Sequence, residues 1–272
     1  MKIKFLGTAA AEGWPALFCN CESCQKARKN GGKNIRTRSS CLINDEYMVD
    51  FPPDTYMHVL MNQLDLSKVE HLLVTHSHDD HFYPEDIQMR KEPYAHINSE
   101  VPLSVYGNDA VKTKYMRTDV EEDKNNRIVF TEVKPLSTYH IGKASVVPLL
   151  ADHTPGETCL LYLFTLGGKT LLYGHDTGYF PEETWAYLEN IKLDVAILDC
   201  TDGPGPCEHY HMGFPAVLNV KDRLEAQHCV GEKTTFVITH FSHNGGLLYD
   251  ELVEMASPHG FIVSYDGMEI SI

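Results

Sequence analysis

The stretch LLVTHSHDDH, residues 72–81, is the most informative part of the sequence. A short apolar run, typical of a buried strand, ends in four metal-ligand side chains, His76, His78, Asp80 and His81. In extended backbone His76 and His78 point to the same side, and Asp80 and His81 then turn toward a neighbouring position. One loop can thus hold two metal ions about 3.5–4 Å apart, as in two-metal hydrolases. The alternative is a polar loop whose histidines are merely solvated.

A second stretch repeats this arrangement late in the chain. FVITHFSH, residues 236–243, is again an apolar run that ends in Thr-His with a further histidine close behind. Two buried strands that deliver histidines from their carboxyl ends indicate one site built from two halves of the fold.

The coarse pattern of the chain predicts runs of strands with helices between them. Such a pattern favours two sheets with helices outside, an α/β fold of the α+β type, over a single doubly wound sheet. No Pro/Gly/Ser-rich linker interrupts residues 1–272, so we expect one domain. The most polar window, Thr118–Arg127, is expected to be an exposed loop or a helix end. Strands are expected near Lys2–Leu6, Cys41–Asn44, Tyr47–Asp50, Leu72–Thr75, Leu103–Tyr106, Ala144–Leu150, Cys159–Thr165, Lys169–Tyr173, Val195–Leu198, Thr235–Thr239, Phe261–Ser264 and Met268–Ile272, and helices near Pro53–Leu64, Pro181–Asn190, Phe214–Gln227 and Leu247–Met255.

Composition narrows the class of protein. The chain has 23 Lys and Arg against 38 Asp and Glu, a formal net charge of −15, which argues against binding along nucleic-acid phosphates or at an anionic membrane surface. No apolar run approaches the roughly 18 residues that span a bilayer, and the N-terminal stretch does not read as a signal peptide. We therefore expect a cytoplasmic protein with reduced cysteines.

The motif H-x-H-x-D-H at the end of a buried strand resembles the signature of the metallo-β-lactamase superfamily of metal-dependent hydrolases. The resemblance implies an αββα sandwich and three further ligands downstream, each after an apolar run: His153, Asp176 and His240. It implies one metal held by His76, His78 and His153, and another held by Asp80, His81 and His240. Asp176 would bridge the two. Taken singly, Asp176 could instead cap a helix and His153 could lie in a surface loop.

Three cysteines, Cys19, Cys21 and Cys24, form C-x-C-x2-C near the N-terminus. Three thiolates at this spacing can wrap one zinc ion but need a fourth ligand; free thiols, or one disulfide and a spare, are the alternatives. The cluster resembles that of the superfamily branch containing phosphoribosyl cyclic phosphodiesterases. That resemblance implies His243 as the fourth ligand and a structural zinc in a loop at about residues 19–33.

The same branch implies a mechanism. Two divalent ions would lower the pKa of a shared water to about 7 and so supply hydroxide at neutral pH. Asp176 and Asp80 would orient that water, and Asp80 would take or shuttle its proton. His211, which precedes a predicted helix, would act as general acid; a surface or helix-capping histidine is the alternative, and His209 lies close enough to be confused with it. His175 is expected to have a supporting role.

The resemblance implies a phosphodiesterase that acts on a small or cyclic phosphodiester, such as a ribose cyclic phosphate. The alternatives are an RNA-processing nuclease of the ribonuclease Z type, a branch related to pyrroloquinoline quinone biosynthesis, and a metal-binding scaffold without catalysis. Two active-site ions (manganese or zinc, or iron) and one structural zinc are expected. We also expect a small-molecule substrate, no nucleic-acid or membrane partner, and, by analogy, a homodimer. Residues 82–100 are expected to border the substrate pocket, whose residues the sequence does not specify.

Overall fold

The computed structural model describes residues 1–98, 101–118 and 127–272, and its strands form two sheets. The first sheet has the order β14–β1–β2–β3–β4–β5–β6, made of β1 (Lys2–Gly7), β2 (Ser40–Ile43), β3 (Tyr47–Val49), β4 (His71–Leu73), β5 (Leu103–Gly107), β6 (Ile128–Glu132) and β14 (Glu269–Ser271). The second sheet has the order β13–β12–β11–β10–β9–β8–β7, made of β7 (Tyr139–Ile141), β8 (Ala144–Leu150), β9 (Leu160–Leu166), β10 (Lys169–Gly174), β11 (Val195–Asp199), β12 (Thr235–Thr239) and β13 (Phe261–Val263).

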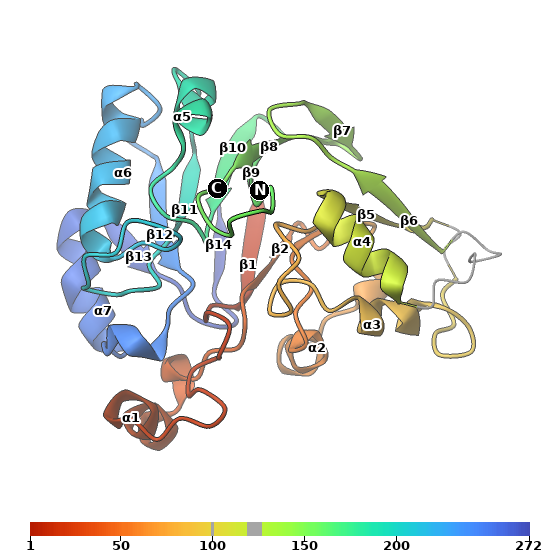
Figure 1. Ribbon diagram of the computed structural model, residues 1–272, viewed down its shortest axis with the longest axis horizontal. Helices are drawn as coiled ribbons and strands as arrows, with labels where there is room; N and C mark the ends of the chain where they lie inside the picture. The colour runs from red at the N-terminus through yellow and green to blue at the C-terminus, as the bar shows by residue number, and fades with distance from the viewer. Residues whose placement is uncertain (99–100, 119–126) are drawn as a thin grey trace.

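Both sheets are mixed, with an antiparallel half and a parallel half. β3, β4, β5 and β6 run parallel in the first sheet, and β10, β11, β12 and β13 run parallel in the second. The chain ends meet in the first sheet, where β1 pairs with β14, and Figure 1 shows both termini side by side. In each parallel half the carboxyl ends of neighbouring strands share one edge, which is where open α/β sheets place their ligands.

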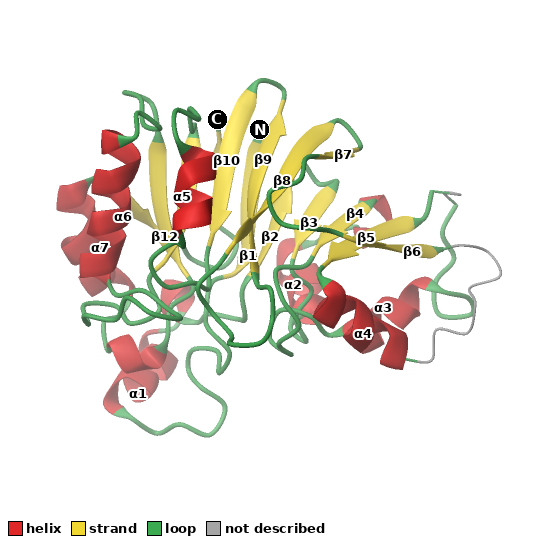
Figure 2. Cartoon of the chain, turned by 45° about the horizontal axis from the view of Figure 1, so that its top comes forward, coloured by secondary structure: helices red, strands yellow, loops and turns green. Residues whose placement is uncertain are grey.

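Helices cover the outer faces of the two sheets (Figures 1 and 2). Beside the first sheet lie α2 (Thr55–Asn62), α3 (Pro84–Ile87) and α4 (Asp109–Arg117), and beside the second lie α5 (Glu182–Leu188), α6 (Phe214–Ala226) and α7 (Tyr249–Ala256). Helix α1 (Glu22–Asn30) projects away from both, within the segment expected to be the zinc-binding loop. Short 3₁₀ turns cover Gly32–Asn34, Leu66–Lys68, Gln88–Arg90, His243–Gly245 and Ser257–His259.

Three apolar layers hold this four-layer sandwich together. Phe5, Tyr162 and Tyr173 lie in the layer between the sheets. A second layer joins the second sheet to its helices, and a third joins the first sheet to α3 and α4. Strand β11 is apolar at alternate positions on both of its faces. Val195 and Ile197 face the other sheet, while Ala196 and Leu198 face the helices. A strand buried on both faces needs no polar alternation.

The predicted two-sheet sandwich is confirmed, and each predicted strand and helix occurs within a few residues of its expected bounds. The sequence analysis missed α1, α3, α4, β6 and β7, which are short or carry mixed polar patterns. The polar window Thr118–Arg127 falls largely on residues 119–126, which lie outside the described residues. Among the described helices, none has the length and apolar character needed to cross a membrane.

Candidate metal centre

Five histidines surround the carboxylate of Asp176, which follows β10. Asp176 Oδ2 lies 3.2 Å from His76 Nε2, 3.0 Å from His81 Nε2 and 3.4 Å from His153 Nε2. Its other oxygen, Oδ1, lies 3.7 Å from His240 Nε2. His78 Nδ1 lies 3.3 Å from His153 Nε2, and Asp80 Oδ2 lies 3.1 Å from His81 Nε2. The structure thus gathers all seven predicted active-site ligands into one cluster.

Each of these histidines has its remaining ring nitrogen engaged by the protein. The contacts are His76 Nδ1 with Thr75 Oγ1 (3.0 Å), His78 Nε2 with Thr154 Oγ1 (3.1 Å), His81 Nδ1 with Asp50 Oδ2 (2.7 Å), His153 Nδ1 with the Tyr210 carbonyl (3.0 Å) and His240 Nδ1 with Thr201 Oγ1 (2.7 Å). Such contacts fix which nitrogen carries the proton, as in metal-ligating histidines. The free nitrogens are therefore oriented toward the centre of the cluster.

Two buried aspartates, one from each sheet, anchor these contacts. Asp50 follows β3 and accepts hydrogen bonds from Thr75 Oγ1 (3.0 Å) and His81 Nδ1. Asp199 ends β11 and accepts from Thr201 Oγ1 (2.8 Å), while its Oδ2 lies 3.3 Å from His240 Nδ1. A threonine thus connects a histidine to a buried carboxylate in both halves of the molecule.

The sequence analysis assigned no role to Asp50, Asp199, Thr75 or Thr201. The sequence could have pointed to the two aspartates. Each stands at the end of an apolar strand, and the adjacent strands of the same sheet also lead into ligand-type residues. Asp50 opens the stretch DFPPD directly after β3. His175, expected to have a supporting role, is buried with Nε2 3.3 Å from Asp50 Oδ2.

The backbone turns sharply where these side chains enter the site. Asp50, Asp176 and His240 all have positive φ, between 54° and 63°. A side chain in this left-handed region costs about 1–2 kcal/mol, and such residues cluster at functional sites. The conformation bends the chain directly after β3, β10 and β12 and points each side chain toward the cluster.

Burial and neighbouring charges shift the pKa values of two of the ligands toward the forms that bind a cation, a neutral histidine and an ionised aspartate. Burial, reinforced by the neighbouring histidine rings, holds the pKa of His76 well below its usual value, so the ring is neutral and Nε2 keeps its lone pair. Burial acts to raise the pKa of Asp176, but the rings of His240 and His81 outweigh it and the pKa lies well below normal. Among the described residues, His76 Nε2 and Asp176 Oδ1 are buried and have no partner in hydrogen-bond geometry. Buried polar atoms of this kind call for a ligand.

Donor spacing also fits a metal. Two ligands bound to one zinc ion at about 2.0–2.1 Å in tetrahedral geometry lie roughly 3.3–3.4 Å apart. Most neighbouring donors of the cluster lie 3.0–3.4 Å apart. His76, His78 and His153 form one group able to hold an ion, and His76, His81 and Asp176 form another.

His211 lies at the edge of the cluster, just before α6. Its Nδ1 is 3.1 Å from Asp176 Oδ1 and 3.8 Å from Asp199 Oδ2, and the side chain is 35% exposed. Burial acts to lower the pKa of His211, but contacts with Asp176 and Asp199 outweigh it and raise the pKa to about 11. His209 Nδ1 lies 3.3 Å from Asp152 Oδ2 with its side chain 76% exposed. Of the two histidines, only His211 lines the cavity of the cluster.

The cysteines and His243 meet beside this cluster. His243 Nδ1 lies 3.4 Å from Cys21 Sγ and 3.7 Å from Cys19 Sγ, close to the roughly 3.5 Å expected for two ligands of one tetrahedral zinc. Cys24 completes the group of four. A hydrogen bond with Ser23 lowers the pKa of the Cys21 thiol to about 5, whereas burial raises that of Cys24 to about 11. All eight cysteines are free, so the disulfide alternative does not occur.

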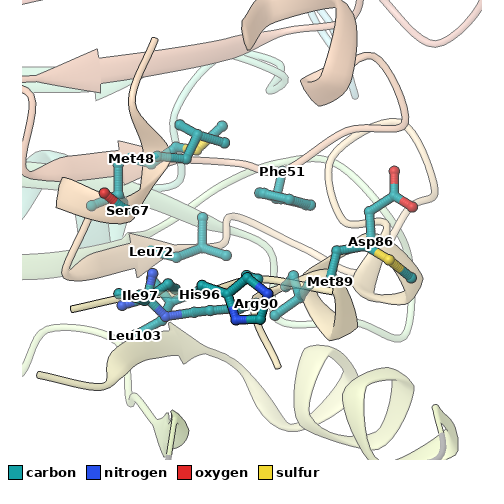
Figure 3. A pocket seen from close by; sticks show the side chains of 14 residues that line it. Met48, Phe51, Ser67, Leu72, Asp86, Met89, Arg90, His96, Ile97 and Leu103 are labelled. Atoms are coloured by element: carbon teal, nitrogen blue, oxygen red, sulfur yellow. The ribbon is translucent and has the colours of Figure 1, made fainter. Parts of the chain in front are cut away.

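The expectation for residues 82–100 is wrong where the structure describes them. The metal cluster opens into a cavity of about 560 Å³ whose lining includes no residue between 82 and 98. Residues 86–97 instead line a separate apolar cavity of about 320 Å³ on the outer side of the first sheet. Figure 3 shows it, with Met48, Phe51 and Leu72 on one side and Met89, Arg90 and His96 on the other.

Comparison with known proteins places this arrangement in a family. Residues 49–246, more than half of the chain, match the β-lactamase superfamily domain, so the chain belongs to that family. The fold and its ligand set indicate a metal-dependent hydrolase of the metallo-β-lactamase type.

The individual proteins that resemble this chain have low sequence identity to it. The chain is 23% identical to coenzyme PQQ synthesis protein B of Acinetobacter baylyi over the full length of both proteins. The crystal structure of a new diphosphatase from the PhnP family superposes with a TM-score of 0.75 and 21% identity, over 100% of this chain and 97% of the other. Zn²⁺-bound PqqB from Methylobacterium extorquens superposes with a TM-score of 0.76 and 17% identity over all of both chains.

Proposed function

We propose that the protein is a phosphodiesterase that uses two divalent metal ions to hydrolyse a small or cyclic phosphodiester. The observation that carries the proposal is that nitrogens of four histidines, His76, His81, His153 and His240, point at the Asp176 carboxylate. His211 lies beside the same carboxylate. His76, His78 and His153 would hold one ion, Asp80, His81 and His240 the other, and Asp176 both. Bound there, the ions would lower the pKa of water and neutralise charge on the phosphoryl group.

The chain itself would handle the protons. Asp80 is 14% exposed, lines the cavity and is placed to accept a proton from the attacking water. Asp199 and Asp176 keep His211 protonated through Nδ1, which leaves Nε2 to donate a proton to the departing oxygen. General acid catalysis of this kind contributes about 10²–10⁴-fold to rate.

A second candidate function is a step in cofactor biosynthesis without diester hydrolysis. The full-length similarity to coenzyme PQQ synthesis protein B favours it. The ribonuclease Z alternative is weaker, because no lysine or arginine occurs among the described residues that line the cavity. Recognition of an RNA backbone depends on such cations.

The test is a matched assay with metal analysis. Protein loaded with zinc, manganese or iron is assayed on bis(p-nitrophenyl) phosphate, on adenosine 2′,3′-cyclic phosphate and on RNA, with metal content measured by element. We expect hydrolysis of the two small diesters and little of RNA. Absence of diesterase activity with every metal would reject the proposal and favour the second candidate.

A further inference from the structure

The cavity beside the metal cluster has two unlike walls. One wall is the ligand cluster with His211. The other consists of Ala10, Ala11, Glu12, Ser242, His243 and Asn244, which connect the cluster to the cysteine site. The volume of about 560 Å³ is large enough for a molecule of nucleotide size, so a substrate whose phosphodiester lies at the first wall would also contact the second.

Glu12 is fixed in place on the second wall. One carboxylate oxygen, Oε1, accepts a hydrogen bond from Ser242 Oγ and lies 3.6 Å from His243 Nε2. Within the described part of the chain, no hydrogen bond or ion pair engages Oε2, and the side chain is 31% exposed. Glu12 therefore presents an acceptor in a fixed position to whatever occupies the cavity.

With a zinc ion bound at the cysteine site, the charge on this wall would be negative. Three thiolates on one divalent zinc would leave the cysteine site at about −1, and Glu12 adds a second negative charge next to His243. The first wall would be the reverse, because the charge of two bound divalent ions would exceed that of the carboxylates Asp80 and Asp176. Arg38 contacts this wall, but it donates to the Ala11 carbonyl (2.7 Å) and pairs with Asp54 (3.1 Å). It does not line the cavity.

We propose that Glu12 selects the substrate of the phosphodiesterase, which rests on the function proposed above. Glu12 accepts a hydrogen bond from a hydroxyl group at the end of the substrate remote from the scissile diester. It also repels a second phosphate there. The substrate class is then a phosphodiester with a neutral, hydroxyl-bearing remainder, such as an unphosphorylated sugar or polyol, and not a bisphosphate.

The test compares two substrates that differ only at the remote end: adenosine 2′,3′-cyclic phosphate and its 5′-phosphorylated form. We expect the wild-type protein to favour the first by at least about tenfold in kcat/KM, since like charges oppose binding. Glu12→Gln keeps the shape but removes the charge, and should reduce this preference about tenfold, mainly through KM. Glu22→Gln, which removes an exposed carboxylate on α1 outside the cavity, should leave the preference unchanged.

A binding measurement gives a second readout. Calorimetric titration of the metal-loaded protein with adenosine 2′-phosphate and adenosine 2′,5′-bisphosphate should show the same preference in Kd, again reduced in Glu12→Gln. Equal use of both diesters by the wild type, or an unchanged ratio in Glu12→Gln, would overturn the inference. Inactivity of the wild type on bis(p-nitrophenyl) phosphate, which has neither a hydroxyl nor a second phosphate, would instead count against the proposed function itself.

Discussion

The histidine–aspartate cluster and the cysteine cluster hold their side chains in different ways. The first draws ligands from segments that follow β4, β8, β10 and β12, and most of them are buried. The second takes three ligands from Cys19, Cys21 and Cys24, on a projecting segment, and one from His243. Buried carboxylates orient the first cluster. The second is supported by contacts such as the hydrogen bond from the Ser23 hydroxyl to the carbonyl of the distant His243 (2.9 Å). The first cluster therefore depends on the packing of both sheets, and the second on the contact of one N-terminal segment with the segment that follows β12.

The largest effect is expected from Asp176→Asn, since this carboxylate contacts four of the histidines. Loss of a charge shared by two ions should lower metal content and reduce kcat/KM on bis(p-nitrophenyl) phosphate by about 10³-fold, a barrier change of several kcal/mol. Asp79→Asn, which alters an 89% exposed carboxylate in the ligand loop, is the control. Full metal content and activity in Asp176→Asn would disprove the central place given to this residue.

His211→Ala should lower kcat by about 10²-fold or more while the metal content stays unchanged, because the ring would serve as proton donor and not as ligand. The loss should be greatest for a diester with a poor leaving group. His209→Ala, two residues away and mostly exposed, should have little effect. Unchanged turnover of the poor leaving group in His211→Ala would remove His211 from the mechanism.

Substitution of the two anchoring aspartates tests whether packing controls the first cluster. Asp50→Asn and Asp199→Asn should each weaken metal affinity or activity by about 10–100-fold, the range for residues that orient metal ligands. Titration of the metal-free variants with Zn²⁺ or Mn²⁺ measures this, with Asp45→Asn in an exposed turn as control. Affinities equal to that of the wild type would show that the histidines orient themselves without these carboxylates.

The smallest effect on catalysis is expected at the second cluster. Cys21→Ser should remove one zinc per chain and lower the melting temperature by about 4 °C or more, for a loss of roughly 2 kcal/mol. The effect on kcat should be only a few-fold, since the cluster braces one edge of the cavity. Cys207→Ser, which removes a free thiol outside both clusters, is the control. Unchanged zinc content in Cys21→Ser would contradict the structural site.

Much of the site could be predicted because its ligands follow apolar runs. THSHDDH, Asp176 and His240 stand at the ends of segments whose alternation or length marks strands, and these strand ends meet at one edge. The anchoring roles of Asp50 and Asp199 were not predicted, since each bonds a histidine many residues away. The placement of residues 82–98 was also wrong, because proximity in sequence to the ligand loop does not reveal which side of a sheet a segment covers.

The sequence by itself determined the chemistry of the protein: which residue types occur, at what spacing, and after which strands. Short-range rules of strand periodicity and ligand type suffice for that. Only the tertiary structure decided how Thr75 and Thr201 connect histidines to buried carboxylates and how His211 differs from His209. It also decided that Glu12 lines the same cavity as the metal cluster, in which no lysine or arginine occurs among the described lining residues. These arrangements join distant segments of the chain, and the strength of each charge depends on its distance from its partners and on its burial.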